Sequence, residues 1–301
     1  MIVQIYEIQT PQEAEICIEA GVDHIGSVLP SSVDWRQPLL KKVIQLSKAA
    51  GVKNTIIPLF QEELILHRAL DYYNPAYLHF CDIFTTDSGR QGDLERNVER
   101  QGRLREIFPE TGIIRTIPIP RKVSGAYEFT AVETARTLAT VTDFFLIDTW
   151  VEKAPVEGFI GITGQTADWD MARELVFNTE VPVILAGGLS PENVYEAVLK
   201  VLPAGADSCT KTNLVGESGK TVRFKKDVEK VKKFVREVRR AEEMIRQEAE
   251  RVTVRLSELK EELSEREAAL PAHSIRPHQL LVIEDLEEEI KLQEKKLNHL
   301  K

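Results

Sequence analysis

The sequence has few cysteines, no long apolar run and no excess of positive charge. Its three cysteines, Cys17, Cys81 and Cys209, lie far apart, which argues against a disulfide framework and against a zinc knuckle built on paired cysteines. Lysine and arginine total 39 against 48 aspartate and glutamate residues, and the net charge of −9 disfavours nucleic-acid and anionic-membrane partners. No run approaches the roughly 18 apolar residues of a membrane span, and no signal-peptide pattern follows Met1, so we expect a cytoplasmic protein.

What the sequence does contain, up to about residue 240, is an alternation of β-branched runs with amphipathic stretches. We expect eight strands, over residues 3–8, 24–29, 55–60, 77–80, 113–117, 144–148, 181–186 and 206–210. Helical patterns begin near Pro11, Pro38, Glu62, Leu94, Ala131, Asp168, Pro191 and Asp227. With 43% hydrophobic and 29% charged residues, the chain can bury a large core. The pattern predicts an α/β fold, a closed (β/α)8 TIM barrel rather than an open doubly wound sheet.

Residues 241–301 lack glycine and are rich in charge. One apolar seam passes through Ile245, Ala249, Val252, Leu256, Leu259 and Leu263, and after a break at 270–277 a second passes through Ile283, Leu286, Ile290, Leu297 and Leu300. We therefore predict two domains, a barrel over 1–240 and an α-helical hairpin, or coiled coil, over 241–301. The two seams can satisfy each other within one chain. Because two helices leave apolar flanks uncovered, we expect a homo-oligomer through these C-terminal helices.

Paired glycines mark a candidate phosphate site at residues 185–194, which read LAGGLSPENV. Gly187 and Gly188 end the expected seventh strand, and Ser190 and Pro191 are suited to the N-cap and first position of a helix. Bare backbone N–H groups beside a helix N-terminus bind phosphate, and barrel phosphate sites are often found after the seventh strand. A tight turn that only caps a helix is the alternative.

Three further features fall at the expected carboxyl ends of strands, where barrel active sites lie. Asp148 ends the apolar sixth strand. A carboxyl group at this place either exchanges protons with a ligand, if its pKa is raised, or caps a helix or loop. Residues 158–169, GFIGITGQTADW, form either a loop that closes over a ligand or a long surface loop. His79 in the fourth strand is either a ligand-binding or a structural hydrogen-bonding group.

These segments, taken in order, resemble the phosphoribosylanthranilate isomerase family over nearly all of residues 1–240. LAGGLSPENV is similar to that family's seventh-strand phosphate loop, and residues 148–169 are similar to its Asp-to-GGTG-to-DW segment. AYLHF at 76–80 and AGADSCTKTN at 204–213 resemble its LHG and VDVSSGVE segments. The resemblance implies the barrel fold, a small phosphorylated sugar as substrate, and the Amadori rearrangement of phosphoribosylanthranilate in tryptophan biosynthesis, with no cofactor.

The resemblance also implies roles for an acid and a base. In the family, an aspartate ending the sixth strand protonates the furanose oxygen, and Asp148 matches it. A cysteine in the family's first-strand KICG pattern removes a proton from the sugar carbon, but here Tyr6 occupies that position and Glu7 replaces the glycine. A phenol of pKa about 10 is less available as a base at neutral pH than a thiol near 8.5. Glu7 is the other candidate, although strand alternation points it away from Tyr6.

Binding residues are implied in the same way, on segments that depart from the family pattern. The candidate substrate- and phosphate-binding residues are Arg36, His79, Gly161, Gly164, Gly187, Gly188, Thr210 and Lys211. Lys211 replaces a family glycine and either obstructs phosphate or supplies a charge, and Arg36 matches a family arginine only approximately, one place out of register. Between His79 and Arg115 the chain is also longer than the family pattern. The inserted segment begins with TTDSGRQGD, and it either reshapes the pocket or elaborates the surface.

Three functions remain open from the sequence. The first is an isomerase with an altered base, the second an enzyme acting on another phosphorylated sugar or small anion, and the third a noncatalytic ligand-binding or scaffold protein that assembles through its coiled coil. The histidines are scattered without ligand spacing, so we expect no metal site.

Overall fold

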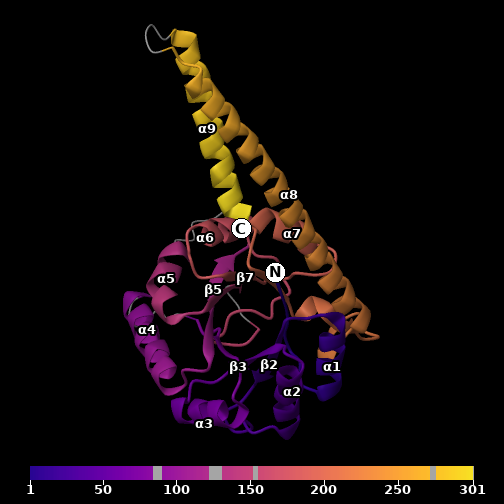
Figure 1. Ribbon diagram of the computed structural model, residues 1–301. Helices are drawn as coiled ribbons and strands as arrows, with labels where there is room; N and C mark the ends of the chain where they lie inside the picture. Colours follow the sequence, from indigo (N-terminus) through magenta and orange to yellow (C-terminus); the bar gives the residue numbers. More distant parts are fainter. Residues whose placement is uncertain (84–89, 122–130, 152–154, 272–275, 301) are drawn as a thin grey trace. The chain divides into compact units, whose positions relative to one another are not determined.

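A computed structural model of the chain describes residues 1–83, 90–121, 131–151, 155–271 and 276–300. Residues 84–89, which carry the start of the predicted insertion, lie outside the described residues. In the described part, eight parallel strands close into a barrel in sequence order, and helices surround it (Figure 1). The predicted TIM-barrel fold is therefore confirmed.

The barrel strands differ from the predicted ones mainly at their ends. Their bounds are β1 Ile2–Ile5, β2 His24–Leu29, β3 Lys53–Pro58, β4 Tyr77–Phe80, β5 Gly112–Pro120, β6 Phe144–Trp150, β7 Val183–Leu185 and β8 Gly205–Ser208. The barrel closes where β1 pairs with β8, with Ile5 opposite Ser208. Tyr6, just beyond β1, packs in the barrel interior against Ile114, Leu146 and neighbouring apolar side chains.

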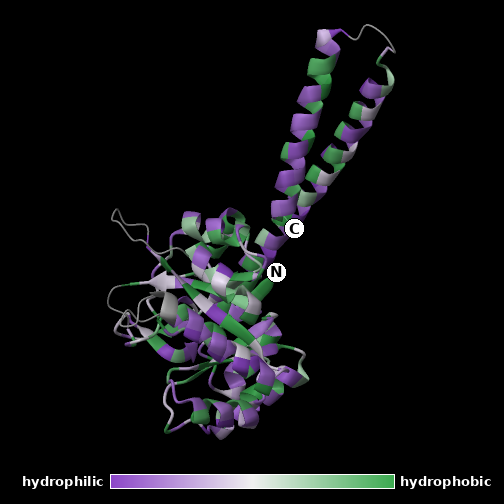
Figure 2. Cartoon of the chain, turned by 90° about the vertical axis from the view of Figure 1, so that its left-hand side faces the viewer, coloured by the Kyte–Doolittle hydropathy of each residue, from purple (hydrophilic) through white to green (hydrophobic). Residues whose placement is uncertain are grey.

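Side-chain caps account for the starts of two helices. The helices are α1 Pro11–Ala20, α2 Pro38–Ala49, α3 Glu63–Tyr73, α4 Arg90–Ile107, α5 Ala131–Leu138, α6 Trp169–Phe177, α7 Val194–Val201, α8 Val228–Ala268 and α9 Pro277–Leu300. Thr10 caps α1 by accepting a hydrogen bond from the Glu13 N–H, and Asp168 caps α6 in the same manner through Asp170 and Met171. In Figure 2 the barrel strands are largely hydrophobic, whereas the surrounding helices carry many hydrophilic residues.

Two local predictions were wrong. Helix α7 begins at Val194 with Asn193 as its N-cap, not at Pro191 with Ser190 as the cap. The reason is a turn closed by Asn193, whose side chain accepts a hydrogen bond from the Ser190 N–H at 2.7 Å and donates one to the Gly188 carbonyl at 3.2 Å. An antiparallel hairpin, β9 (Asn213–Val215) and β10 (Thr221–Lys226), also follows β8 where no strand was predicted. Its strands are short and half exposed, and the alternation of Val222 and Phe224 is too brief to predict a strand.

The chain divides into two compact units, Met1–Arg239 and Arg240–Lys301. In the second unit, α9 and the part of α8 from Arg240 onward pack their apolar seams together. The buried seam residues are Val252, Leu256, Leu259, Leu286 and Ile290. Ion pairs flank the seam, including Arg255–Glu289 at 3.0 Å and Lys260–Glu294 at 2.7 Å. None of the described helices is long and apolar enough to cross a membrane.

Candidate active site

Two adjoining cavities lie in the part of the barrel lined by the carboxyl-terminal ends of the strands. The first contains about 510 Å³ of empty space, part of it open to solvent, and its polar walls include Tyr6, Glu7, His79, Asp148 and Asp207. The second contains about 300 Å³, lined by Asp148, Asp207 and the glycine-rich segments. The residues common to both walls are Asp148, Ile162, Asp207 and Cys209. A ligand with a phosphate in one cavity and a sugar in the other would therefore contact both aspartates.

Asp148 is held within strand β6, close to its end. Its Oδ1 accepts a hydrogen bond from the Thr149 N–H at 2.7 Å. Asp148 is half-buried, and desolvation raises the pKa of its carboxyl group to about 6, although the Thr149 hydrogen bond opposes the rise. A carboxyl group with such a pKa is partly protonated near neutral pH and is suited to donate a proton.

The loop before α6 passes directly over this carboxyl group. Gly161 has a φ of +104°, and a Cβ built there would lie less than 3.0 Å from Oδ2 of Asp148, so only glycine fits without a shift. Strand-like pairing holds the loop to the end of β4. The Ile160 N–H donates to the Cys81 carbonyl at 2.7 Å, and the Ile83 N–H donates to the Gly158 carbonyl at 2.9 Å. Ile160 and Ile162 then form an apolar wall of the first cavity.

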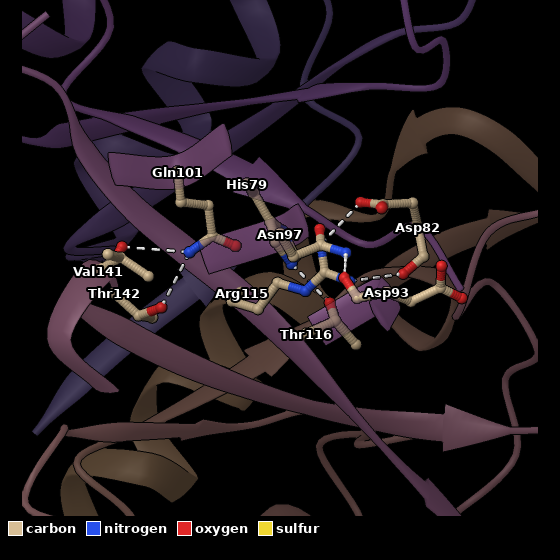
Figure 3. Close-up of polar contacts among 9 residues, drawn as sticks. All are labelled: His79, Asp82, Asp93, Asn97, Gln101, Arg115, Thr116, Val141 and Thr142. Carbon is tan, nitrogen blue, oxygen red and sulfur yellow. Dashed lines mark hydrogen bonds and ion pairs between the residues drawn. The ribbon is translucent and has the colours of Figure 1, made fainter. Parts of the chain in front are cut away.

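The phenol of Tyr6 is tied into a buried hydrogen-bond chain. Its oxygen lies 2.7 Å from Nδ1 of His79, and Nε2 of His79 lies 2.7 Å from Oγ1 of Thr116 (Figure 3 shows the His79–Thr116 end). Burial, and then the negative charge of Asp207, raise the pKa of Tyr6 well above its usual value. Burial and the nearby Arg115 lower the pKa of His79 to about 3, so this ring is neutral. Both of its ring nitrogens are occupied whichever tautomer is present.

Glu7 lies in the left-handed backbone region, with a φ of +62°, where the family pattern has glycine. This kink brings Glu7 into the wall of the same cavity as Tyr6, contrary to the simple alternation of a strand. Its side chain is only 2% exposed and accepts hydrogen bonds from Arg223 at 2.5 and 2.7 Å and from Asn213 at 3.2 Å. Burial alone would raise the pKa of Glu7, but Arg223 outweighs it and the pKa is lowered. Arg223 was missed from the sequence because its hairpin was not predicted.

Asp207 is a second residue that the sequence analysis did not single out. It lies on β8 in the register Gln4–Asp207, and its side chain is 5% exposed. Within the described part of the chain, its Oδ1 is buried without a hydrogen-bond partner. Burial, and then the charge of Asp148, raise the pKa of Asp207 well above its usual value. The available signal was an aspartate inside the last barrel strand, where a charged residue is costly unless it has a function.

The predicted phosphate residues come together around the second cavity. Gly164, Gly187, Gly188, Thr210 and Lys211 all line it. A Cβ at Gly188 would lie 2.6 Å from the backbone carbon of Gln165, so the backbones of the two loops approach closely here. A cavity with bare backbone and one ammonium group suits a phosphate dianion.

Arg36 does not join these cavities. It is exposed, and its guanidinium stacks over the ring of Tyr72 at 4.9 Å from the ring centroid. Neither cavity wall includes it. Its predicted role in substrate binding stays a prediction.

A fully buried arginine fixes the end of β4 beside the first cavity (Figure 3). Arg115 donates to Oδ1 of Asp82 at 2.8 Å, to the Asp82 carbonyl at 2.9 Å, and to Oδ1 of Asn97 at 3.2 Å. Because Asn97 belongs to α4 and Asp82 follows β4, these bonds tie the longer β4–α4 segment to the barrel. Within the described residues, no cluster of three or more histidine, cysteine, aspartate or glutamate side chains could hold a metal ion.

Comparisons with known proteins identify one family. The family described as N-(5'phosphoribosyl)anthranilate (PRA) isomerase matches residues 109–237. The N-(5'-phosphoribosyl)anthranilate isomerase of Methanosarcina acetivorans is 36% identical over 238 residues, which cover 77% of this chain and 91% of that protein.

Solved structures support the fold alone, because their sequence identities are low. The isomerase from Pyrococcus furiosus has a TM-score of 0.54 and 21% identity, over 80% of this chain and 99% of that one. A phosphoribosyl anthranilate isomerase in complex with reduced 1-(o-carboxyphenylamino)-1-deoxyribulose 5-phosphate has a TM-score of 0.51 and 18% identity, over 79% of this chain and 99% of that one.

Proposed function

The chain belongs to the phosphoribosylanthranilate isomerase family, and from this membership we propose that it catalyses the Amadori rearrangement of phosphoribosylanthranilate in tryptophan biosynthesis. The reaction converts an aminoaldose to an aminoketose, so the protein is an aldose–ketose isomerase. The observation that carries the proposal is the shared wall of the two cavities, where Asp148 stands between a phosphate-sized site and a mainly apolar pocket.

We assign Asp148 as the general acid that protonates the furanose oxygen. Its raised pKa, its position in both cavity walls and the close approach of Gly161 support the assignment. The phosphate of the substrate is assigned to Gly164, Gly187, Gly188 and neighbouring residues, with Lys211 supplying positive charge where the family has a glycine.

The base predicted from the sequence was Tyr6 or Glu7, and the geometry lends neither of them support. The Tyr6 phenol is occupied by His79, and burial makes its ionisation harder. Glu7 is ionised but bound by Arg223 and Asn213, and a carboxylate of lowered pKa is a weak base. The assignment of either residue as the base stays a prediction, and substitution of each residue tests it.

The C-terminal hairpin favours a second, additional function as an assembly element. Its apolar side chains are not all used within the chain, since Val254, Leu281 and Leu292 are exposed. We propose that these flanks pair with another copy, as the sequence predicts. We also keep the expected cytoplasmic location as a proposal, because tryptophan biosynthesis uses small soluble metabolites.

Steady-state turnover of purified protein with freshly generated phosphoribosylanthranilate tests the main proposal, with Asp148→Asn as the blank. Turnover in the wild type that vanishes in the variant is the expected result. A wild type that binds the reduced product analogue, 1-(o-carboxyphenylamino)-1-deoxyribulose 5-phosphate, but does not turn over would overturn the isomerase assignment and favour a ligand-binding role.

A further inference from the structure

The side chain of Asp207 has an unusual environment for a carboxyl group. It is 5% exposed, and its Oδ1 has no hydrogen-bond partner within the described residues. Gln4 is a hydrogen-bonding neighbour of this carboxyl group, but a buried charged oxygen without a partner of its own still costs free energy unless a ligand or a proton compensates it. Asp207 lines both cavities, as Asp148 does, so a ligand in these cavities can reach its carboxyl group.

The other titratable groups in the first cavity are already engaged or are hard to ionise. Tyr6 and His79 bond to each other, and Glu7 is paired with Arg223. Burial raises the pKa of the Cys81 and Cys209 thiols, which keeps them protonated. Among the titratable residues that line the first cavity, Asp148 and Asp207 remain available for proton transfer.

We propose that Asp207 is the catalytic base of this chain and removes the C2′ proton of the ribose while Asp148 acts as the acid. The inference rests on the proposed isomerase function and names the base which that function needs. The proposed base lies on β8, the strand that pairs with β1, and Tyr6 directly follows β1. Since Tyr6 follows β1 and its N–H donates to the Ser208 carbonyl at 3.1 Å, the two positions are neighbours in the barrel.

One proton shared by the two carboxyl groups balances the reaction. Asp148 gives its proton to the ring oxygen, the C1′–O bond breaks, and C1′ becomes an iminium carbon. The Asp207 carboxylate then takes the C2′ proton, and the electron pair of that C–H bond forms the enolamine. Asp207 returns a proton to C1′ while the enol hydroxyl returns one to Asp148, which leaves the aminoketose and restores both groups.

The electrostatics of the cavity fit a pair that holds a single proton. Two carboxylates in one desolvated space disfavour double ionisation, and such pairs titrate as a unit. Burial and the charge of Asp148 hold the pKa of Asp207 up, while the hydrogen bond of Gln4 and then the ammonium of Lys226 oppose the rise. When Asp148 holds the proton it carries no charge, and its contribution to the raised pKa of Asp207 is absent. Glu7 also faces this space, but Arg223 neutralises its charge.

The test measures the full-length Asp207→Asn variant with freshly generated phosphoribosylanthranilate, unlabelled and deuterated at C2′. We expect kcat to fall by at least about 100-fold, the effect of losing a general base, and deuterium to slow the remaining turnover. Asp71→Asn, at an exposed residue of α3, is the matched control and should keep wild-type kcat. Binding of the reduced product analogue shows that each variant is folded.

Several results would overturn the assignment. A kcat within threefold of the wild type means that Asp207 is not the base. A loss of kcat without any effect of C2′ deuterium means that Asp207 only positions or binds substrate. If Asp207→Asn does not fold, Asp207→Ala with added formate decides, because formate restores turnover only where a carboxylate base is missing. Absence of wild-type turnover instead refutes the isomerase proposal itself.

Discussion

The phenol oxygen of Tyr6 lies 2.7 Å from Nδ1 of His79, and this contact makes a structural pair of two residues that sequence reasoning placed in the active site. The ring of Tyr6 also fills the space over Gly26, where a Cβ would lie less than 3.0 Å from the ring. A tyrosine at this position therefore extends the barrel core where the family pattern has a reactive thiol.

Tyr6→Phe tests this interpretation. The substitution leaves a buried nitrogen of His79 without its partner, so we expect a loss of about 1–3 kcal/mol in the free energy of unfolding, measured by urea denaturation. It removes no base, so kcat should fall by much less than the ~100-fold expected for a lost base. Tyr72→Phe, on the outer helix α3, is the control for removing a hydroxyl. A large loss of kcat with normal folding would restore Tyr6 as the base.

The pKa of Asp148, about 6 in the folded chain, predicts that both activity and stability fall as the pH rises. As an acid it must be protonated, so kcat/KM should decline as the pH rises above about 6. The raised pKa also means that ionisation destabilises the folded state, and this penalty grows as the pH rises from the unfolded value of about 3.9 through the folded value.

Asp148→Asn should therefore be inactive yet more stable than the wild type at pH 8, by about 1–3 kcal/mol, and show no such gain at pH 3. Thermal and urea denaturation at both pH values measure the difference. A variant that is less stable at pH 8 would show that the carboxylate makes favourable contacts that burial does not reveal.

The sequence predicted the barrel because eight apolar runs and their helices repeat a simple period. The candidate phosphate residues Gly164, Gly187 and Gly188 line one cavity, and their binding of phosphate stays a prediction. The sequence did not predict how Glu7 is used, because its partner Arg223 lies 216 residues away on a hairpin whose strands are too short to be predicted. Asp207 was missed for a related reason, since its missing hydrogen-bond partner becomes visible only once the strands surround it.

Gly161→Ala probes the loop over the acid. The added Cβ would press on Oδ2 of Asp148 from a backbone with a φ of +104°, so we expect a loss of about 1–3 kcal/mol in stability and a marked fall in kcat. Gly158→Ala is a matched control on the same loop, with a φ of +81° but open space around its Cβ. It should show the backbone strain without the loss of kcat. Equal kcat values in the two variants would contradict the contact with Asp148.

Arg115→Met tests the buried bonds between the barrel and α4. The change leaves Asp82 and Asn97 without their donor in a buried site, so we expect a loss of about 3–5 kcal/mol in the free energy of unfolding. Arg105→Met is the control, because Arg105 pairs with Asp143 at a half-exposed site and should cost less than about 1 kcal/mol. Similar losses in both variants would mean that Arg115 contributes no more than a surface ion pair.

Leu259→Ala separates the hairpin from the barrel. Leu259 is 0% exposed in the α8–α9 seam, and its truncation should cost about 2–5 kcal/mol of local stability. Hydrogen exchange should then rise in α9 while the barrel strands keep their protection. Neither cavity wall contains a residue from Arg240–Lys301, so isomerase turnover should not change. Leu292→Ala, at a side chain that is 65% exposed on the flank proposed to pair with another copy, is the comparison of equal size. Pairing of this flank predicts faster exchange in α9 for this variant too. Unchanged exchange in Leu292→Ala would contradict the proposed assembly.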